Sequence, residues 1–194
     1  MSKEELNKEE LIKIECWEKA FHALGTSYVF SKKAILYTKG IRIITVLVLV
    51  VPILLGGTLM AYGKDSHFLD LLIAITAPVV IIHLVLAILA LIYKWDDKLA
   101  YSFESQTDNR IISGEYETLA KFPTSDIKEL EMKFEIIKAK DNARTIQDEK
   151  ITFSEKENRM GMRYALYIRK KACVTCKKVP STMTPSECET CGKF

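Results

Sequence analysis

Four of the five cysteines in this 194-residue chain lie close to its C-terminal end, between positions 173 and 191, where they form two CxxC pairs. Cys173 and Cys176 make the first pair, Cys188 and Cys191 make the second, and together they follow the pattern CxxC-x11-CxxC. Two such pairs can bring four thiolates into the tetrahedron that Zn²⁺ prefers. A bound metal would stabilise a segment that is too short to hold a core of its own. The spacing therefore predicts a closed, structural zinc site.

The expected site has no open coordination position, because all four ligands come from the protein. Iron in a rubredoxin-like site is the main competitor, since the same ligands accept it. A redox-active dithiol is less favoured, because two pairs at this spacing imply a shared centre. Gly192 directly follows the second pair, where a tight turn often needs a permissive backbone.

The segment around the first pair is basic, because no Asp or Glu occurs from Asn158 to Ser186. Two interpretations are open. The positive charge can compensate Zn²⁺ with four thiolates, which carries about −2, or it can contact a nucleotide, nucleic acid or anionic lipid. Nucleic acid is disfavoured, because the net charge of the whole chain is only +3. The candidate anion contacts are Arg159, Arg163, Arg169, Lys170 and Lys171.

The elements that must position these residues include two apolar segments, 41–62 and 69–93. Residues 41–93 carry two basic and two acidic side chains, whereas the rest of the chain carries 26 and 23. Because a helix rises about 1.5 Å per residue, each segment can cross a hydrocarbon core of about 30 Å. Two buried helices of a soluble core are the alternative, but the polar-rich remainder is too small to cover both. We therefore predict a transmembrane hairpin with a short polar turn, 63–68.

Basic residues near the two segments predict the orientation of the hairpin. They lie before the first segment and after the second, while the turn carries only Lys64. No apolar stretch typical of a signal peptide occurs in residues 1–20, so the first span is expected to act as its own uncleaved signal. We expect a membrane protein with two spans and both termini in the cytoplasm. The basic residues are Lys32, Lys33 and Lys39 on one side, and Lys94, Lys98 and Arg110 on the other.

Polar and helix-breaking residues inside the two apolar segments are costly and point to function. The candidate pore or gating residues are Pro52, Asp70, Pro78 and His83. The prolines predict a kink in each span. His83 either hydrogen-bonds across to Thr45 or Thr58 of the first span, or lines a water path between protomers. Because two spans cannot enclose a channel, a pore needs several copies, and we expect a homo-oligomer.

The N-terminal segment, 1–40, is charged and typical of a cytosolic amphipathic helix. Six apolar side chains recur at steps of three and four, which places them on one stripe that packs on another helix or lies in the headgroup layer. Cys16 lies off this stripe, and we interpret it as an unremarkable free thiol, since a reducing cytosol disfavours disulfides. The stripe consists of Leu11, Ile14, Trp17, Phe21, Leu24 and Tyr28.

Residues 94–172 are expected to form a cytosolic helical region. The second span should continue into it, and Ser113–Gly114 and Phe122–Pro123 are helix breakers. Ser125 or Asp126 can cap a new helix, which is followed by either one very long helix or two helices in line. The predicted fold is an all-α membrane protein: a two-helix transmembrane hairpin with N-terminal and long C-terminal cytosolic helices and a small C-terminal zinc knuckle. The four expected regions are 1–40, 41–93, 94–172 and 173–194.

Catalytic motifs are missing from the sequence. It contains no P-loop, GxGxxG, GxSxG or HExxH motif, and its three histidines have neither metal-site nor triad spacing. We therefore expect a protein that is not an enzyme. An intrinsically disordered chain is excluded as well, because 48% of the residues are apolar.

A charged helical arm, a two-span hairpin, a long cytosolic helix and a terminal CxxC-x11-CxxC together resemble the SLATT-type two-transmembrane proteins. The resemblance is to the branch found on mobile elements, whose cysteine spacing is matched by Cys173, Cys176, Cys188 and Cys191. It implies a membrane effector of bacterial conflict or anti-phage systems. Such effectors are proposed to oligomerise and permeabilise the inner membrane when a sensor, often a nucleotide-signalling enzyme, detects invasion.

The alternative hypothesis is a membrane-anchored adaptor. In that case the hairpin is only an anchor, and the zinc tail with its basic helix recruits a cytosolic partner. A small secondary transporter is weaker, because coupling sites are usually built from more spans. The expected partners are the lipid bilayer, further copies of the chain, and a sensor protein or a nucleotide second messenger.

Overall fold

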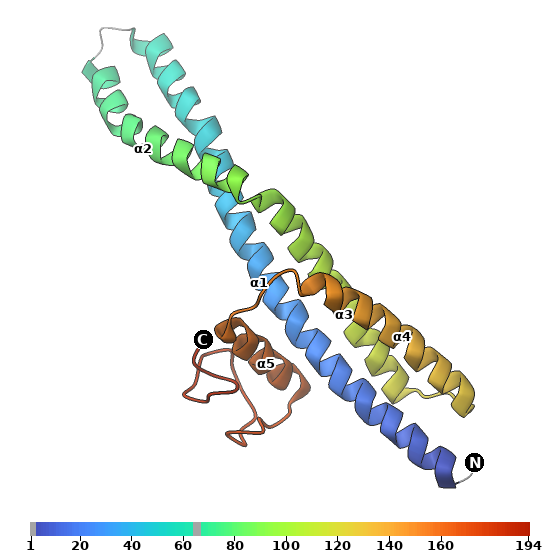
Figure 1. Cartoon of the computed structure of the whole chain (residues 1–194). Coiled ribbons are helices and arrows are strands. Elements are labelled where there is room, and N and C mark those ends of the chain that lie inside the picture. The colour runs from blue at the N-terminus through green and yellow to red at the C-terminus, as the bar shows by residue number, and fades with distance from the viewer. Residues whose placement is uncertain (1–2, 64–66) are drawn as a thin grey trace. The chain divides into compact units, whose positions relative to one another are not determined.

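The computed structural model describes residues 3–63 and 67–194, and this part of the chain is all-helical (Figure 1). The helices are α1 (Lys3–Tyr62), α2 (His67–Ile92), α3 (Trp95–Lys121), α4 (Ile127–Asp148) and α5 (Glu155–Arg169). Residues 64–66 of the expected hairpin turn lie outside the described residues. The chain divides into two compact units, one made of Met1–Lys32 and Ser102–Phe194, the other of Lys33–Tyr101.

α1 is a single helix of 60 residues, so the expected N-terminal arm and first span are continuous. No Pro occurs in α1 before Pro52, and nothing in the sequence ends the helix at residue 40. Pro52 itself lies inside α1, and Pro78 lies inside α2.

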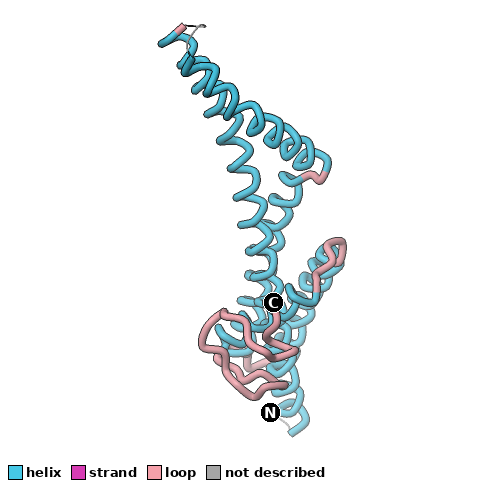
Figure 2. The backbone as a smooth tube through the Cα atoms, turned by 90° about the vertical axis from the view of Figure 1, so that its left-hand side faces the viewer, coloured by secondary structure: helices cyan, strands magenta, loops and turns pink. Residues whose placement is uncertain are grey.

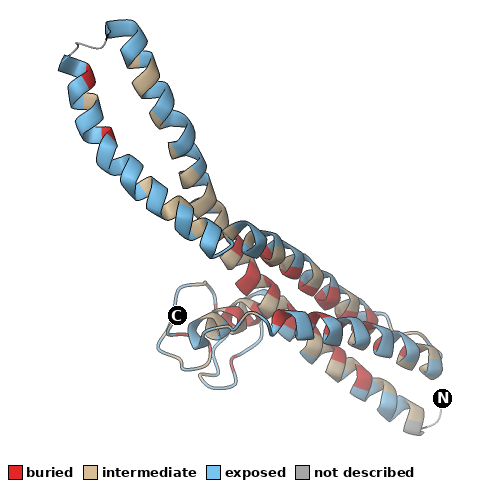
Figure 3. Cartoon of the chain, turned by 45° about the horizontal axis from the view of Figure 1, so that its top comes forward, coloured by how far each residue is buried: buried red, intermediate tan, exposed pale blue. Residues whose placement is uncertain are grey.

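The unit Lys33–Tyr101 contains the end of α1 and all of α2. Both helices are long and apolar enough to cross a membrane. Large apolar side chains such as Ile53, Ile75 and Ile82 are exposed along them. Figure 3 shows that most of α2 is exposed. The unit therefore presents apolar side chains outward rather than burying them in a core of its own.

The second span does not continue into α3, contrary to expectation. α2 ends at Ile92, and Lys94 adopts a left-handed φ of 50°, which ends helical hydrogen bonding before Trp95 begins α3. Trp95 then packs over Gly40 of α1, where a Cβ would lie 2.7 Å from the indole ring. The close approach at Gly40 explains why a small residue stands there.

α1, α3 and α4 share the core of the other unit (Figure 3). The predicted stripe of α1 packs only in part: Leu11 and Ile14 are 59% and 53% exposed, whereas Trp17 packs against the edge of this core. Small side chains let the helix backbones approach closely, which is why the core face is rich in alanine. The buried core residues are Ile12, Cys16, Ala20 and Ala23 of α1, Ile112, Tyr116, Leu119 and Ala120 of α3, and Leu130, Phe134 and Ile137 of α4.

Helix boundaries after the hairpin follow the sequence in part. The prediction of a break at Ser113–Gly114 is wrong: α3 continues through it, and the Ser113 hydroxyl donates to the Ala20 carbonyl 2.7 Å away on α1. The break at Phe122–Pro123 is confirmed, and Asp126 caps α4 by accepting from the Lys128 N–H at 2.9 Å.

The region after Asp126 contains two helices rather than one. α4 ends at Asp148, and α5 starts with a capping box in which Ser154 and Glu157 bond reciprocally. In Figure 1, α5 and the C-terminal loops lie on one side of α1, and α3 and α4 on the other. α1 is therefore the central helix of this unit.

Candidate metal centre

The four predicted ligands meet at one point. The Sγ atoms of Cys173, Cys176, Cys188 and Cys191 all lie within 4.8 Å of one another. Two pairs, Cys173–Cys188 and Cys176–Cys191, have Sγ–Sγ distances of 3.9 Å. A tetrahedral site with metal–sulfur bonds of about 2.3 Å needs sulfur atoms about 3.8 Å apart. The cluster therefore fits one four-coordinate metal ion, and the predicted clustering of the four cysteines is confirmed.

The two CxxC turns share a backbone pattern. The Lys177 N–H donates to the Cys173 carbonyl at 2.8 Å, and the Gly192 N–H donates to the Cys188 carbonyl at 2.9 Å. Each turn thus folds back over its own first cysteine, which brings the two thiols of the pair to the same side. The knuckle is otherwise free of regular structure from Lys170 to Phe194 (Figure 2).

The reason for glycine at position 192 differs from the expected one. Gly192 does not adopt a left-handed φ; the left-handed residues near the site are Lys177 and Lys193, with φ of 58° and 54°. Instead, a Cβ on Gly192 would overlap the carbonyl oxygen of Ser186. Close approach of two backbone segments, rather than the turn conformation, requires glycine here.

The surroundings shift the thiol pKa values in opposite directions. Backbone N–H groups of Cys191 and Thr190 lower the pKa of Cys188 to about 6. Burial raises the pKa of Cys191 to about 12. One ligand is therefore predisposed to the thiolate form, whereas another is held as the thiol until a cation displaces its proton.

The knuckle is docked on the helical bundle. Cys173 and Cys191 are each 1% exposed and form a small apolar cluster with Leu166 of α5. Phe21 of α1 and Met162 of α5 pack against this cluster. The metal centre thus fixes the C-terminal loops to α5 and to α1.

Arg163 holds the knuckle from within. Its guanidinium donates to the Thr182 carbonyl at 2.9 Å, the Cys191 carbonyl at 3.1 Å and the Ser186 hydroxyl at 3.2 Å. It is 8% exposed. Arg163, a candidate anion contact by sequence, is therefore engaged by the chain's own loop.

Arg169 is also engaged within the chain. It forms an ion pair with Glu117 of α3 and lies over the Trp17 ring at 5.6 Å. Hydrogen bonds from Lys121 and Arg169 lower the pKa of Glu117. Arg169 thereby joins the end of α5 to α3 and α1.

The other three candidate anion contacts are more exposed. Arg159 lies 3.4 Å from Glu155, one turn earlier in α5. Lys170 adopts the left-handed C-cap of α5 with its amine over the Tyr167 ring at 4.5 Å, and Lys171 is exposed. The structure thus does not gather the five predicted contacts into one site, because Arg163 and Arg169 point to internal partners.

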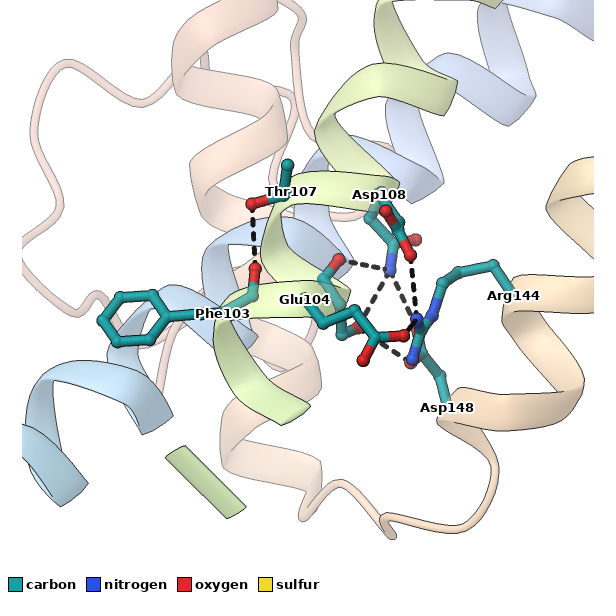
Figure 4. A network of polar contacts seen from close by, with 8 residues as sticks. Phe103, Glu104, Thr107, Asp108, Arg144 and Asp148 are labelled. Carbon is teal, nitrogen blue, oxygen red and sulfur yellow. Dashed lines mark hydrogen bonds and ion pairs between the residues drawn. The ribbon is translucent and has the colours of Figure 1, made fainter. Parts of the chain in front are cut away.

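Sequence reasoning missed a buried charge network in the bundle (Figure 4). The Arg144 side chain is 4% exposed and bonds to Asp148, Glu104 and Asp108 at 2.9 Å each. Asn109 also donates to Asp148, at 2.7 Å. Burial by itself would lower the pKa of Arg144, but the three carboxylates outweigh burial and raise it. The signal in the sequence is the i, i+4 spacing of Glu104 with Asp108 and of Arg144 with Asp148.

The four candidate gating residues fall in the unit Lys33–Tyr101. His83 contacts the carbonyl oxygen of Ile44 at 3.1 Å. Thr45 and Thr58, its predicted partners, instead donate to carbonyls of their own helix at 3.0 and 2.7 Å. The partner of His83 on α1 is thus the backbone carbonyl of Ile44, the residue before Thr45, and not a threonine hydroxyl.

A small cavity joins two of these candidates. Pro52 of α1 and His83 of α2 line a space of about 200 Å³ between the two helices, together with Val48 and Val80. Asp70 and Pro78 do not line it. The structure therefore brings Pro52 and His83 together and leaves the other two candidates apart from them.

Over the described residues, the fold and site define an all-helical protein with two helices apolar enough to cross a membrane and a C-terminal knuckle whose four cysteines are able to hold a metal ion. The family model of the Mobilome CxxCx(11)CxxC protein matches residues 13–194, and the chain belongs to this family. Neither the curated proteins nor the solved structures contain a significant match.

Proposed function

We propose that this protein is a membrane effector of a bacterial conflict or anti-phage system, encoded with mobile elements and similar to SLATT-type effectors. It acts without catalysis: several copies assemble in the inner membrane and permeabilise it when triggered. The observation that carries the proposal is the apolar surface of α1 and α2. Membership in a mobile-element family supports the biological setting.

The outward apolar side chains of the hairpin favour a bilayer over water. Among the described residues between 43 and 93, 25 large apolar side chains are exposed. Fully burying one such side chain contributes about 1.5–3 kcal/mol. Exposing this many to water would cost more than the 5–15 kcal/mol or so by which a domain is usually stable. Insertion of both helices, with the charged termini in the cytoplasm, removes that cost.

Permeabilisation needs more than one copy, because two helices cannot enclose a water path. Pro52 and His83 suit a change in helix packing, since they border the same small cavity between α1 and α2. Pro52 leaves the Val48 carbonyl without its helical donor. An imidazole beside that break can exchange one carbonyl partner for another as neighbouring hairpins rearrange.

We propose that the knuckle binds Zn²⁺ as a structural ion, with iron as the competitor. Zn²⁺ supplies tetrahedral cross-linking of four thiolates and no redox chemistry. Cys173, Cys176, Cys188 and Cys191 would hold it, and Arg163 positions the loop that carries the second pair.

A membrane-anchored adaptor is the second candidate. The docked knuckle with its exposed lysines favours it, because a rigid charged surface suits recruitment of a cytosolic partner. Under this proposal the hairpin is an anchor, and apolar replacements within it leave function intact.

The test is membrane potential and dye entry in bacteria on induction of the protein. Wild type is compared with a variant carrying His83→Leu and Asp70→Leu. Thr58→Val is the matched control, since the Thr58 hydroxyl bonds only to its own helix at 2.7 Å. Immunoblots of carbonate-washed membranes serve to check that all three proteins insert equally.

We expect depolarisation by wild type and by the control, and its loss in the double variant. Depolarisation by all three proteins would support permeabilisation and would show that His83 and Asp70 are not required for it. No depolarisation by any of them, with equal insertion, overturns the effector and favours the adaptor.

A further inference from the structure

α1 presents three faces to its surroundings within its own unit. Cys16 and Ala20 face the core with α3 and α4, and Phe21 faces the knuckle. On the third face, Leu11 and Ile14 are 59% and 53% exposed. Residues at a spacing of three and four stand on one side of a helix, so this third face is a continuous strip.

A groove of about 1000 Å³ runs between this strip, α4 and the α4–α5 connection. Its apolar lining includes Leu11, Ile14, Ile151 and Phe153. An open apolar strip beside a well-packed core indicates a surface that another element covers.

The groove is acidic. Five carboxylates line it, and Lys19 and His22 are the basic residues among the lining side chains. Three of the carboxylates are neutralised inside the chain, by Lys138, Lys19 and Arg144. The five are Glu15, Glu18, Asp141, Asp148 and Glu149. Glu18 and Glu149 are exposed and have no ion pair among the residues that the structure describes, so the groove offers unpaired negative charge to a basic surface. We call it the acidic groove.

The knuckle carries the complementary surface. Lys171, Lys177 and Lys178 are exposed and make no ion pair within the described part of the chain. Val174 and Val179, in the same stretch of chain, are 76% and 47% exposed. The set is thus basic and apolar at once, as the groove is acidic and apolar. We call these five residues with Lys170 the basic rim.

We propose that the acidic groove of one copy binds the basic rim of a second copy of this chain. The proposal rests on the assembly postulated under the proposed function and names the contact that builds it. Because groove and rim are different surfaces, the contact is heterologous, and each copy offers one of each to its neighbours. The same contact can therefore repeat around a ring.

A chain cannot fill its own groove. Cys173 and Cys191 fix the knuckle against Leu166 and Phe21. In Figure 1 the knuckle and α4, which forms one wall of the groove, lie on opposite sides of α1. The rim of a neighbouring copy can approach the groove without such a constraint. Metal binding then controls assembly, because the loop that carries Lys177 and Lys178 is folded by the four cysteines.

The first experiment is zero-length carbodiimide coupling on an equal mixture of ¹⁴N- and ¹⁵N-labelled full-length protein in detergent micelles, read by mass spectrometry. This reagent joins amines to carboxylates in direct contact, and isotope mixing separates coupling between copies from coupling within one. We expect mixed-isotope peptides that join Lys171, Lys177 or Lys178 to Glu15, Glu18 or Glu149 of the groove. Coupling that is confined to same-isotope peptides, or mixed-isotope coupling only at other sites, overturns the proposal.

The second test is charge reversal. Its readout is the coupling of Lys171 to Glu15, because neither residue is substituted in the variants. The rim variant carries Lys177→Glu and Lys178→Glu, and the groove variant carries Glu18→Lys and Glu149→Lys. Each alone should lower mixed-isotope coupling of Lys171 to groove carboxylates by roughly tenfold, since like charges then face each other. A mixture of the two variants should restore it, because each interface is again of opposite charge.

The matched control carries Lys128→Glu and Lys156→Glu, at exposed sites in the first turns of α4 and α5. These two substitutions change the net charge by the same amount as those of the rim variant. The control should couple like wild type. Equal loss in this control would mean that net charge alone acts, which overturns the proposal. Protection of the rim lysines from acetylation by phosphatidylglycerol vesicles, without mixed-isotope coupling, would assign the rim to a lipid surface instead.

The two proposals fail separately. Mixed-isotope coupling without depolarisation in cells leaves the contact standing and removes the effector role. Depolarisation without this coupling leaves permeabilisation standing and removes the groove contact.

Discussion

Gly161 of α5 lies so close to Gly25 of α1 that a Cβ added to Gly161 would be 2.9 Å from the Gly25 carbonyl oxygen. Next to this crossing, the rings of Tyr28 and Tyr164 stack with centroids 4.0 Å apart. The two glycines thus let α5, and with it the knuckle, rest directly on the backbone of α1. Because α1 continues into the apolar hairpin, this crossing ties the metal centre to the helix that enters the proposed membrane span.

Gly161→Ala tests this crossing. Overpacking a tight contact costs about 1–3 kcal/mol, which exceeds the gain of about 1 kcal/mol in helix propensity. We expect a lower free energy of unfolding, measured by urea titration of the detergent-solubilised protein with tryptophan fluorescence. Gly114→Ala is the matched control: nothing lies within 4 Å of its added Cβ, so it should stabilise by about 0.5–1 kcal/mol. Equal effects of the two substitutions would contradict the close contact.

Arg144→Leu should be among the most destabilising single substitutions in the helical bundle. Removing one partner of a buried ion pair costs about 3–5 kcal/mol, and Asp148, whose side chain is 10% exposed, is the carboxylate that would lose its counter-charge in a buried position. The same urea titration measures the loss. Arg110→Leu, at an exposed position of α3, should change stability by less than about 0.5 kcal/mol. A small effect of Arg144→Leu would show that Asp148 and its neighbours are solvated or protonated in solution.

The metal site and the hairpin helices could be predicted because their signals are local. Cys173 to Cys191 carry their geometry in the spacing, and two apolar runs that are each long enough to span a bilayer have few structural alternatives. Asp126 and Ser154 illustrate a similar case, since capping depends on close neighbours in the sequence.

The face of α1 that packs in the core could not be predicted from apolar periodicity. Cys16, Ala20 and Ala23 enter the core because helices that cross closely select small side chains, and a search for large apolar side chains favours Leu11 and Ile14 over these three. The role of Arg163 was missed for a related reason. Its partners Thr182 and Cys191 are distant in sequence, and charge patterning cannot tell a solvated arginine from one that holds a loop.

Cys16 provides a pH-dependent test of the same core. Burial and the nearby charge of Glu15 raise the pKa of its thiol to about 11, whereas an unfolded cysteine ionises near pH 8.5 or so. The folded state therefore holds this proton more tightly. The resulting stability is complete below about pH 8.5 and is lost as pH rises toward 11.

Unfolding free energy of wild type should accordingly fall more steeply between about pH 8.5 and 10.5 than that of Cys16→Ala, in which this thiol is absent. Iodoacetamide should modify Cys16 of the folded protein far more slowly than after urea unfolding, because the side chain is buried. If the unfolding free energies of the two proteins fall with pH at the same slope, Cys16 is solvated and does not lie in the core.

Cys176→Ser should release the metal and loosen the knuckle while leaving the helices of the bundle folded. We expect about one zinc per wild-type chain by elemental analysis, and a large loss in the variant, because three thiolates no longer close the tetrahedron. Cys16→Ala is the matched control for thiol number and should keep the full metal content, since Cys16 lies in the α1–α3–α4 core and not in the cluster.

In Cys176→Ser, hydrogen exchange should speed up in residues 173–194, including the loop segments whose carbonyls accept hydrogen bonds from Arg163. Acid and a strong chelator should have the same local effect on wild type, because protons compete with the metal for the thiolates. Full metal content in Cys176→Ser, or unchanged exchange in the tail after metal removal, would contradict a structural metal centre.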